Sequence, residues 1–166
     1  KKNNIQEFGH LPSHWKLSKF KYLAEITMGQ SPRSENYNSD GIGTPFLQGN
    51  SEFGEIHPKN KLWTTEITKK SRKGDILLSI RGSVGEMNWS DENYCIGRGL
   101  CAISPINLNN TFCWYFLKSS KYKFKSISAG STFLSINTDD IKNLFIPLPE
   151  KEEQKLISKY LDKKTK

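Results

Sequence analysis

The feature that most restricts how this chain can fold is a change of pattern between Leu144 and Asp162. Residues 144–146 are apolar and lead into Pro147 and Pro149, and the residues from Glu150 onwards are highly charged. Proline cannot donate to a sheet ladder but is well suited to the start of a helix. The pattern therefore predicts a strand at 144–146 that stops at Pro147, followed by an amphipathic helix.

The predicted C-terminal helix carries one apolar stripe on an otherwise charged surface. Glutamates near its start and lysines near its end suit the helix dipole. The stripe could pack against the chain's own core, or the helix could be the start of a spacer cut from a longer protein. We favour the second interpretation, with one domain at 1–149 and the start of the spacer at 150–166. The stripe consists of Leu156, Ile157, Tyr160 and Leu161.

The centre of the chain has the pattern of short strands with glycine-rich corners. Asp75–Ile80 is the clearest strand, because its apolar run lies between Gly74 and Arg81-Gly82. We expect Val84–Trp89 and Tyr94–Ile96 to be its antiparallel neighbours and Leu100–Ile103 to be a further strand that Pro105 ends. Ala24–Thr27 and Pro45–Gln48 are predicted as strands nearer the N-terminus.

The clearest helical signals lie in the last third of the chain, although Trp15–Leu23 could form a short helix or turn and Trp63–Lys70 fits either a strand or a helical turn. Asn110–Leu117 is predicted as a helix capped by Asn109 or Asn110, and Thr138–Asn143 as a short helix capped by Thr138. The basic stretch Lys118–Lys125 is expected to be a loop that leads into a second helical turn. The fold class that follows is α+β: a single domain with a curved, mainly antiparallel β-sheet, a few short helices and the C-terminal helix.

The formal net charge of +8 is unevenly distributed. Residues 1–33 carry +4 and residues 118–166 carry +5, whereas residues 34–117 carry −1. Lysine and arginine gain affinity for nucleic acid by releasing counterions from phosphates. The charge therefore agrees with a polyanionic partner, although a lysine-rich solvated surface would look the same.

Signatures of several enzyme classes are missing from the sequence. It has no phosphate-binding G-x-x-x-x-G-K-[ST], no G-x-G-x-x-G, no G-x-S-x-G and no H-E-x-x-H. The three histidines lie in polar segments, and the three cysteines lie among apolar residues without metal-like spacing. We therefore expect no catalytic residue, no metal site, no cofactor and no disulfide. With no apolar run of membrane-spanning length, the sequence also predicts a cytoplasmic protein.

The arginines are few and most of them lie in glycine- and serine-rich loops. Arg33, Arg81 and Arg98 have this setting, and a guanidinium can grip guanine bidentately or clamp a phosphate. Neighbouring amides and hydroxyls could add contacts to base edges. The alternative is ordinary turns with arginines paired to acids such as Asp75 or Glu86. The candidate base readers are Gln30, Ser31, Arg33, Gln48, Asn50, Arg81, Ser83 and Arg98.

Two further groups complete the candidate set. Lys118, Lys121 and Lys123 lie among aromatic residues, a pattern that favours contact with a nucleic-acid backbone but also fits a solvated face. Ser131 and Thr132 could contact DNA or serve only as turn hydroxyls.

Four segments together resemble one target-recognition domain of a type I restriction–modification specificity subunit. The segments are Leu11–Leu17; Glu25–Pro32 with Pro45–Asn50; Gly74–Gly82 with Gly85; and Gly130–Thr132 followed by Ile146–Ile157 and Tyr160–Asp162. The last is the most specific, and the order and spacing of all four strengthen the resemblance.

The resemblance implies a non-catalytic reader of double-stranded DNA. Such subunits carry two recognition domains separated by long helices, each reading one part of a split target. The helices dock methyltransferase subunits, and a motor–nuclease subunit joins them; S-adenosylmethionine is bound elsewhere. A chain with one such domain is either a fragment or a half-length subunit, which would need a second recognition domain or a homodimer partner.

Two other classes of function remain open from the sequence. A protein-interaction or scaffold module with incidental basic charge would bind a partner through the terminal helix and ignore DNA. A small nuclease without a recognisable motif would show turnover that depends on an acidic residue of this chain.

Overall fold

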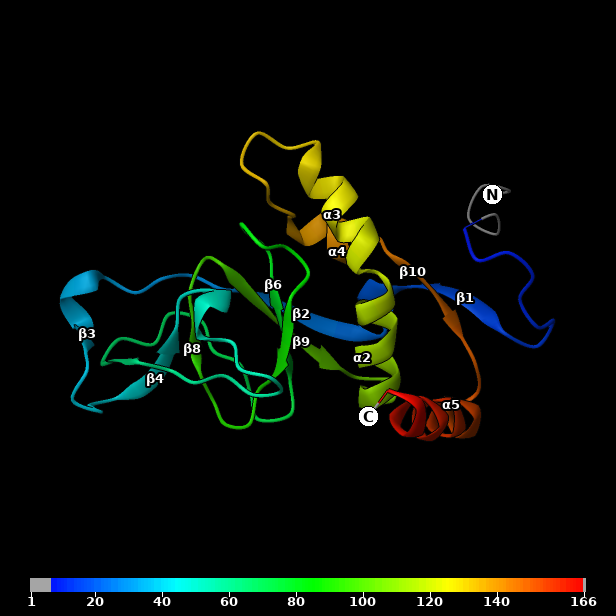
Figure 1. Cartoon of the computed structure of the whole chain (residues 1–166), viewed down its shortest axis with the longest axis horizontal. Coiled ribbons are helices and arrows are strands. Elements are labelled where there is room, and N and C mark those ends of the chain that lie inside the picture. Colours follow the sequence, from blue (N-terminus) through cyan, green and yellow to red (C-terminus); the bar gives the residue numbers. More distant parts are fainter. Residues whose placement is uncertain (1–6, 166) are drawn as a thin grey trace.

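The structure is a computed structural model that describes residues 7–165. It combines short strands with helices, which confirms the α+β class (Figure 1). The strands are β1 (Lys16–Lys19), β2 (Ala24–Met28), β3 (Tyr37–Asn38), β4 (Thr44–Leu47), β5 (Leu62–Thr64), β6 (Ile76–Ser79), β7 (Met87–Trp89), β8 (Cys95–Ile96), β9 (Leu100–Pro105) and β10 (Phe145–Leu148). The α-helices are α2 (Asn110–Ser119), α3 (Lys121–Ala129), α4 (Thr138–Lys142) and α5 (Lys151–Lys164), and short 3-10 turns are η1 (Phe20–Tyr22), η2 (Ser34–Asn36) and η3 (Asn50–Glu52).

An antiparallel sheet in the order β2-β9-β6-β7 forms the centre of the molecule. The apolar run of β6 is continuous because both faces of this sheet are covered. Ile76 and Leu78 belong to the larger hydrophobic core, whereas Leu77, between them, belongs to a smaller cluster with Leu47 and Leu100. All of these side chains are buried. The two clusters thus lie on opposite faces of one sheet, because successive side chains of a strand point to opposite faces.

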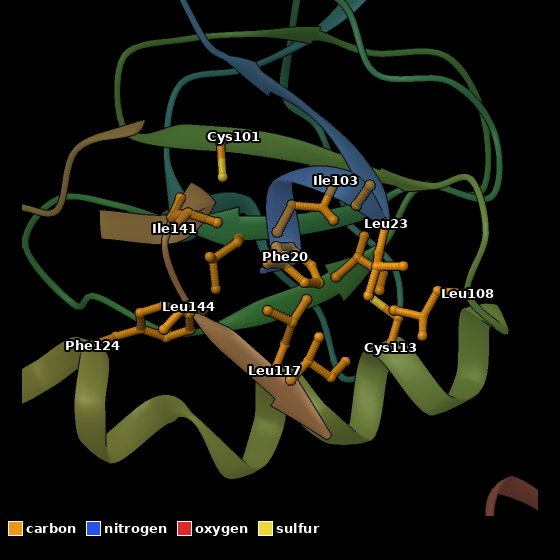
Figure 2. Packing of buried hydrophobic residues seen from close by; sticks show 14 of the residues in the cluster. Phe20, Leu23, Cys101, Ile103, Leu108, Cys113, Leu117, Phe124, Ile141 and Leu144 are labelled. Carbon is orange, nitrogen blue, oxygen red and sulfur yellow. The ribbon is translucent and has the colours of Figure 1, made fainter. Parts of the chain in front are cut away.

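The larger core lies between the central sheet and the helices (Figure 2). Phe20 and Leu23 from the β1–β2 connection meet Leu117 of α2 and Phe124 of α3 there, and Ile141 of α4 closes one side. The N-terminal strand connection is therefore fixed against three helices, which sets the direction in which β2 leaves the core.

A second sheet in the order β3-β5-β4-β8 lies at one end of the elongated molecule (Figure 1). The prediction that Tyr94–Ile96 pairs antiparallel with the strand at 75–80 is wrong. Its two-residue strand β8 pairs parallel with β4, through Phe46–Cys95 and Leu47–Ile96. The prediction failed because neighbours in sequence usually pair, whereas Tyr94 and Ile96 are buried between the two sheets.

At the other end of the molecule, β1 pairs with β10 in a two-stranded sheet. Strand β10 continues through Pro147, opposite Leu17, instead of stopping there. In a two-stranded sheet both strands are edge strands. Proline is tolerated in an edge strand where its nitrogen, which has no hydrogen, does not face the neighbouring strand. The sequence correctly predicted a strand here, but the observed strand extends beyond residue 146, to Leu148.

Two helical predictions need correction. Lys118–Lys125 is not a loop that leads into a helical turn; α2 extends to Ser119, and α3 begins at Lys121. The alternating lysines hid the fully buried Phe124, which anchors α3. Helix α4 is capped by Asn137, whose side chain accepts hydrogen bonds from the backbone N–H groups of Asp139 (2.8 Å) and Asp140 (3.0 Å). Asn109 caps α2, as one of the two predicted alternatives.

Helix α5 packs along α2, and its apolar stripe is divided between two environments. Ile157 packs against the core and Leu161 is half-buried, whereas Leu156 and Tyr160 are 66% and 61% exposed. The most buried side chains of the helix are instead polar, Gln154 and Ser158. The described part of the helix thus has a docked face and an outer face with two exposed apolar side chains.

Candidate nucleic-acid interface

Three glycine-containing loops meet at one edge of the two large sheets. Residues 29–33 follow β2, residues 48–50 follow β4, and residues 97–99 join β8 to β9. Backbone hydrogen bonds join them: Gln30 N–H donates to Ile96 O (2.9 Å), and Gly99 N–H donates to Gln48 O (3.1 Å). The sheet order therefore brings together residues that are far apart in the sequence.

The loops pack so closely that two glycines are required. A Cβ atom on Gly29 would lie 2.0 Å from the carbonyl oxygen of Gly97, and one on Gly97 would lie 3.0 Å from Gln48 Cα. Glycine in a loop can allow a backbone to approach a bound molecule, such as a duplex, closely. At these two positions the structure shows a different use, the approach of one loop of the chain to another.

Arg81 and Arg98 line one shallow depression of about 300 Å³. Ile80 N–H donates to Gly99 O (2.9 Å), and a single β-bridge joins Arg81 to Ser135, so the loops that carry the two arginines are fixed to each other. Both arginines are exposed, and neither forms an ion pair within residues 7–165. The predicted alternative, a pair between a loop arginine and Glu86, is not formed here. Two uncompensated guanidinium groups beside one hollow favour a bound anion.

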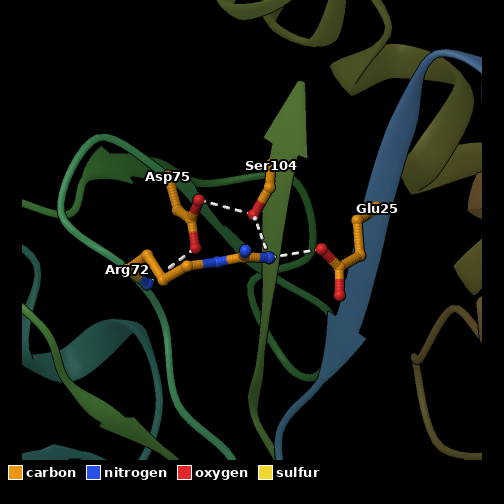
Figure 3. Close-up of polar contacts among 4 residues, drawn as sticks. All are labelled: Glu25, Arg72, Asp75 and Ser104. Atoms are coloured by element: carbon orange, nitrogen blue, oxygen red, sulfur yellow. Dashed lines mark hydrogen bonds and ion pairs between the residues drawn. The ribbon is translucent and has the colours of Figure 1, made fainter. Parts of the chain in front are cut away.

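Arg72 shows the opposite environment for an arginine (Figure 3). Its guanidinium pairs with Glu25 and donates to Ser104 Oγ (3.4 Å), and its backbone N–H donates to Asp75 Oδ2 (2.7 Å). The pKa of Arg72 is raised, first because of the hydrogen bond to Glu25. This arginine ties β2 to β9 and to the residues before β6, which is the structural role that the sequence analysis had weighed for the loop arginines.

Arg33 and Ser31 differ from the other candidate readers. Arg33 Nη1 lies 3.8 Å from Glu35 Oε1, and both side chains are exposed, so the pair is weak. Ser31 Oγ accepts from Arg98 N–H (3.2 Å) and thus positions the 97–99 loop. Gln30 and Gln48 are exposed beside it, and Asn50 is half-buried at the start of η3.

Glu66 and Thr68 hold the first loop in place, and the sequence analysis missed both. Glu66 Oε2 accepts from the backbone N–H of Arg33 (3.1 Å) and from Asn36 Nδ2 (2.7 Å). These hydrogen bonds lower the pKa of Glu66 below its ordinary value of 4.5. Thr68 Oγ1 donates to the carbonyl oxygen of Gln30. In the sequence, residues 63–70 contain threonine and isoleucine, which favour a strand, at a spacing that also fits a helical turn, so the segment gave no clear sign of its role.

The three candidate lysines are not grouped together and have different neighbours. Lys121 pairs with Glu86 (2.7 Å) and Lys123 pairs with Glu7 (2.7 Å). Lys118 instead lines a hollow between α2 and the end of α5, together with the stacked rings of Trp89 and Trp114. Partly exposed ion pairs are worth about 0–1 kcal/mol, so the two paired lysines can exchange a carboxylate for a phosphate at little cost.

Serine and threonine candidates separate into structural and exposed groups. Ser131 Oγ donates to Ser128 O (2.9 Å) and accepts from Ser135 N–H (3.0 Å), which is the turn role weighed as its alternative. Ser83 and Thr132 are exposed. The Ser83 carbonyl accepts from Ser79 Oγ, which fixes the turn after β6.

The cysteines and histidines have the surroundings that their places in the sequence indicate. All three cysteines are buried free thiols, and burial raises the pKa of Cys101 to about 12. His10, His14 and His57 are exposed, as expected. Within residues 7–165, no three His, Cys, Asp or Glu side chains are grouped closely enough to bind a metal. Nor does that part of the chain contain a helix long and apolar enough to cross a membrane.

Comparison with known proteins gives a consistent result. The family model described as "Type I restriction modification DNA specificity domain" matches residues 12–166. The chain is 42% identical over 160 residues to a protein named for the specificity subunit of the type I restriction enzyme MjaX of Methanocaldococcus jannaschii, covering 93% of this chain and 37% of that protein. It is 26% identical over 154 residues to the EcoDI specificity subunit of Escherichia coli, covering 93% and 32%.

Solved structures from type I restriction–modification systems also match this chain. A chain from a structural study of the assembly and conformational transition of a type I restriction–modification system matches with a TM-score of 0.87 and 39% identity, over 95% of this chain and 40% of that chain. The specificity subunit from Thermoanaerobacter tengcongensis matches with a TM-score of 0.83 and 38% identity, over 93% and 38%. The chain thus spans about one third to two fifths of the length of these proteins.

Proposed function

The chain belongs to the type I restriction–modification DNA specificity family, and from that membership we propose that it reads one part of a two-part target in double-stranded DNA. The observation that carries the proposal is the pair of uncompensated arginines, Arg81 and Arg98, at the edge where the loops meet. Guanidinium groups can bind guanine O6 and N7 bidentately, and neighbouring amides can read adenine. Gln30 and Gln48 supply such amides on the adjoining loops.

The proposed division of roles follows the contacts of each side chain. Arg33, Arg81, Arg98, Gln30, Gln48, Asn50, Ser83 and Thr132 are the candidates for contact with DNA. Lys118, Lys121 and Lys123 would contribute salt-dependent attraction to phosphates. Ser31 and Ser131 act by positioning the loops, because their hydroxyls are already used within the chain.

The chain's partners in this proposal are those of a type I system. Residues 150–166 would be the start of the spacer helix, and methyltransferase subunits would dock on it, with a motor–nuclease subunit completing the assembly. Leu156 and Tyr160 on the outer face of α5 are the candidate contacts. A second recognition domain, or a second copy of this chain, would read the other part of the target. The chain itself would be non-catalytic and cytoplasmic.

The test uses the chain assembled with its methyltransferase subunits. Preferred duplexes are selected from a randomised pool, and the affinity for the selected duplex is compared with that for a scrambled one. Replacement of Arg81 or Arg98 by alanine should reduce that ratio by about 5- to 150-fold, equivalent to about 1–3 kcal/mol per bidentate contact. If the wild-type complex shows no preference, the proposed function is wrong; if the variants keep full discrimination, the reader assignment is wrong.

A further inference from the structure

The segment between α3 and α4 lies beside the loop of Arg81. Gly82 N–H donates to the carbonyl oxygen of Leu134 (3.2 Å), and Ser135 forms the bridge to Arg81. Ser135 and Ile136 line the same depression as the two arginines. In Figure 1 this segment, drawn in yellow to orange, projects from the body of the molecule beyond the end of α3.

Two large apolar side chains stand at the tip of this segment. Phe133 is 84% exposed and Leu134 is 52% exposed. An exposed phenylalanine forgoes the stabilisation that burial would provide, about 1.5–3 kcal/mol for a large apolar side chain. Exposed apolar surface rimmed by polar groups can mark an interaction site, and here two adjacent apolar side chains are exposed in the segment that lies against the loop of Arg81.

The backbone of the tip is held in a conformation that leucine rarely adopts. Leu134 has φ +46°, and it is the one non-glycine residue with positive φ among residues 7–165. Such a conformation persists only where the surroundings enforce it, and it concentrates at functional sites. Here Ser131 Oγ closes the turn by accepting from Ser135 N–H (3.0 Å). The segment is thus tied at its base, which gives the tip a fixed place beside Arg81.

We propose that Phe133 is a wedge that stacks on, or inserts into, one base step of the duplex beside the site of Arg81 and Arg98. The inference rests on the proposed function and adds a specific contact to it. The positive charges favour a polyanionic partner over an apolar protein surface, and every base offers a face on which an aromatic ring can stack. Apolar side chains that unstack a base step occur in other DNA-binding proteins, where they kink the duplex.

The experiment uses the chain in its complex with the methyltransferase subunits and the duplex that the wild-type complex selects. Each adenine in and beside the preferred sequence is replaced in turn by 2-aminopurine, whose fluorescence rises when it is unstacked. The wild-type complex should brighten one position beside the site of Arg81 and Arg98, apart from the adenine that the methyltransferase subunits extrude. Phe133→Ala should abolish that signal and weaken binding about 10-fold, within the range of one base–aromatic stack. Phe133→Trp should restore both.

Tyr22→Ala is the matched control. Tyr22 is an aromatic residue that is 64% exposed, and it lies before β2, at the opposite end of that strand from Gly29. Its replacement should leave both the affinity and the fluorescence signal unchanged. Because Phe133 and Tyr22 are both exposed, the thermal stability of the two variants should match that of the wild type.

The outcomes separate this inference from the proposed function. Absence of any sequence preference in the wild-type complex overturns the proposed function, and the wedge with it. A wild-type complex that is selective, with Phe133→Ala equally tight and equally bright, overturns the wedge alone. Reduced assembly of Phe133→Ala with the methyltransferase subunits would also overturn it, since Phe133 would then be a protein contact.

Discussion

The four arginines of this chain show how the surroundings of a residue determine what it can do. The guanidinium of Arg72 is occupied by Glu25 and Ser104, and its backbone N–H donates to Asp75. Arg81 and Arg98 are exposed and have no acidic partner within residues 7–165. Arginines of one chain therefore differ in whether their guanidinium groups are free to bind an external ligand. The sequence alone does not show which of them are free.

Arg81→Lys and Arg98→Lys should separate charge from geometry. Lysine keeps the positive charge but lacks the planar fork that binds guanine through two hydrogen bonds. We expect each variant to retain the dependence of binding on salt while losing about 1–3 kcal/mol of discrimination between preferred and scrambled duplexes. Titrations across a range of salt concentrations measure both quantities. Equal discrimination by the lysine variants would assign these arginines to phosphate contact only.

Acidification should loosen the loop that carries Gln30 and Arg33. The pKa of Glu66 is lowered in the folded protein by its hydrogen bonds to Arg33 N–H and Asn36. The stabilisation from this carboxylate is therefore complete above its ordinary pKa of 4.5 and is lost as the pH falls through the lower folded value.

Backbone amide exchange of residues 30–36 as a function of pH, corrected for intrinsic rates, tests this expectation. Glu66→Gln serves as the control, because its amide does not titrate and should remove the pH-dependent part. A loop whose corrected exchange is insensitive to pH in the wild type would contradict the role of Glu66.

The thiols of Cys101 and Cys113 should be inert in the folded protein. Burial raises the pKa of Cys101 to about 12 and also raises the pKa of Cys113, and only the thiolate is nucleophilic. A thiol reagent at pH 8 should modify these two cysteines only after denaturant is added. Peptide mapping by mass spectrometry identifies the modified sites, and rapid labelling of Cys101 without denaturant would contradict the packing described here.

At the scale of elements, the sequence predicted those with a strong local pattern. The apolar run before Arg81 and the capped helix after Asn109 were both found, because periodicity and capping act over a few residues. The pairing of β8 with β4 was missed, since it depends on burial between two sheets. Only a helical turn was expected where the nine-residue helix α3 lies, because the lysines on both sides of the buried Phe124 resemble a solvated loop.

The docking of α5 shows a further limit of pattern reading. Its most buried residue, Gln154, is 1% exposed and looks like a solvent-facing residue in the sequence. Its Oε1 accepts from Asn109 N–H (2.9 Å), and its Nε2 donates to Pro149 O (2.9 Å). Ser158 Oγ donates to Asn109 Oδ1 (3.1 Å), so polar side chains of α5 bind the first turn of α2.

Gln154→Ala should destabilise the domain by about 1–3 kcal/mol, because it leaves a buried N–H and a buried carbonyl group without partners. Chemical denaturation followed by tryptophan fluorescence measures the loss. Leu156→Ala on the outer face of the same helix is the control and should change stability by less than about 0.5 kcal/mol. A larger effect at Leu156 than at Gln154 would mean that α5 docks through its other face.

At the scale of the whole molecule, the fold class followed from the sequence but the shape of the site did not. Sequence reasoning named Gln30, Gln48, Arg81 and Arg98 from their loop settings without any basis for placing them together. The order of strands in the two sheets makes those loops neighbours, and Gly29 permits the contact. Phe133, beside them, was not singled out, because an apolar residue in a sequence is read first as part of a core.

The central claim is that the edge formed by these loops is the surface that meets DNA. Photo-crosslinking of the assembled complex tests it most directly, with a photoreactive amino acid at Gln48 on that edge or at Ser83 in the turn that follows Arg81, and at Lys159 on α5 as the control; all three positions are exposed. We predict crosslinks to the preferred duplex from Gln48 and Ser83 and none from Lys159. Crosslinks from Lys159 alone would contradict the account.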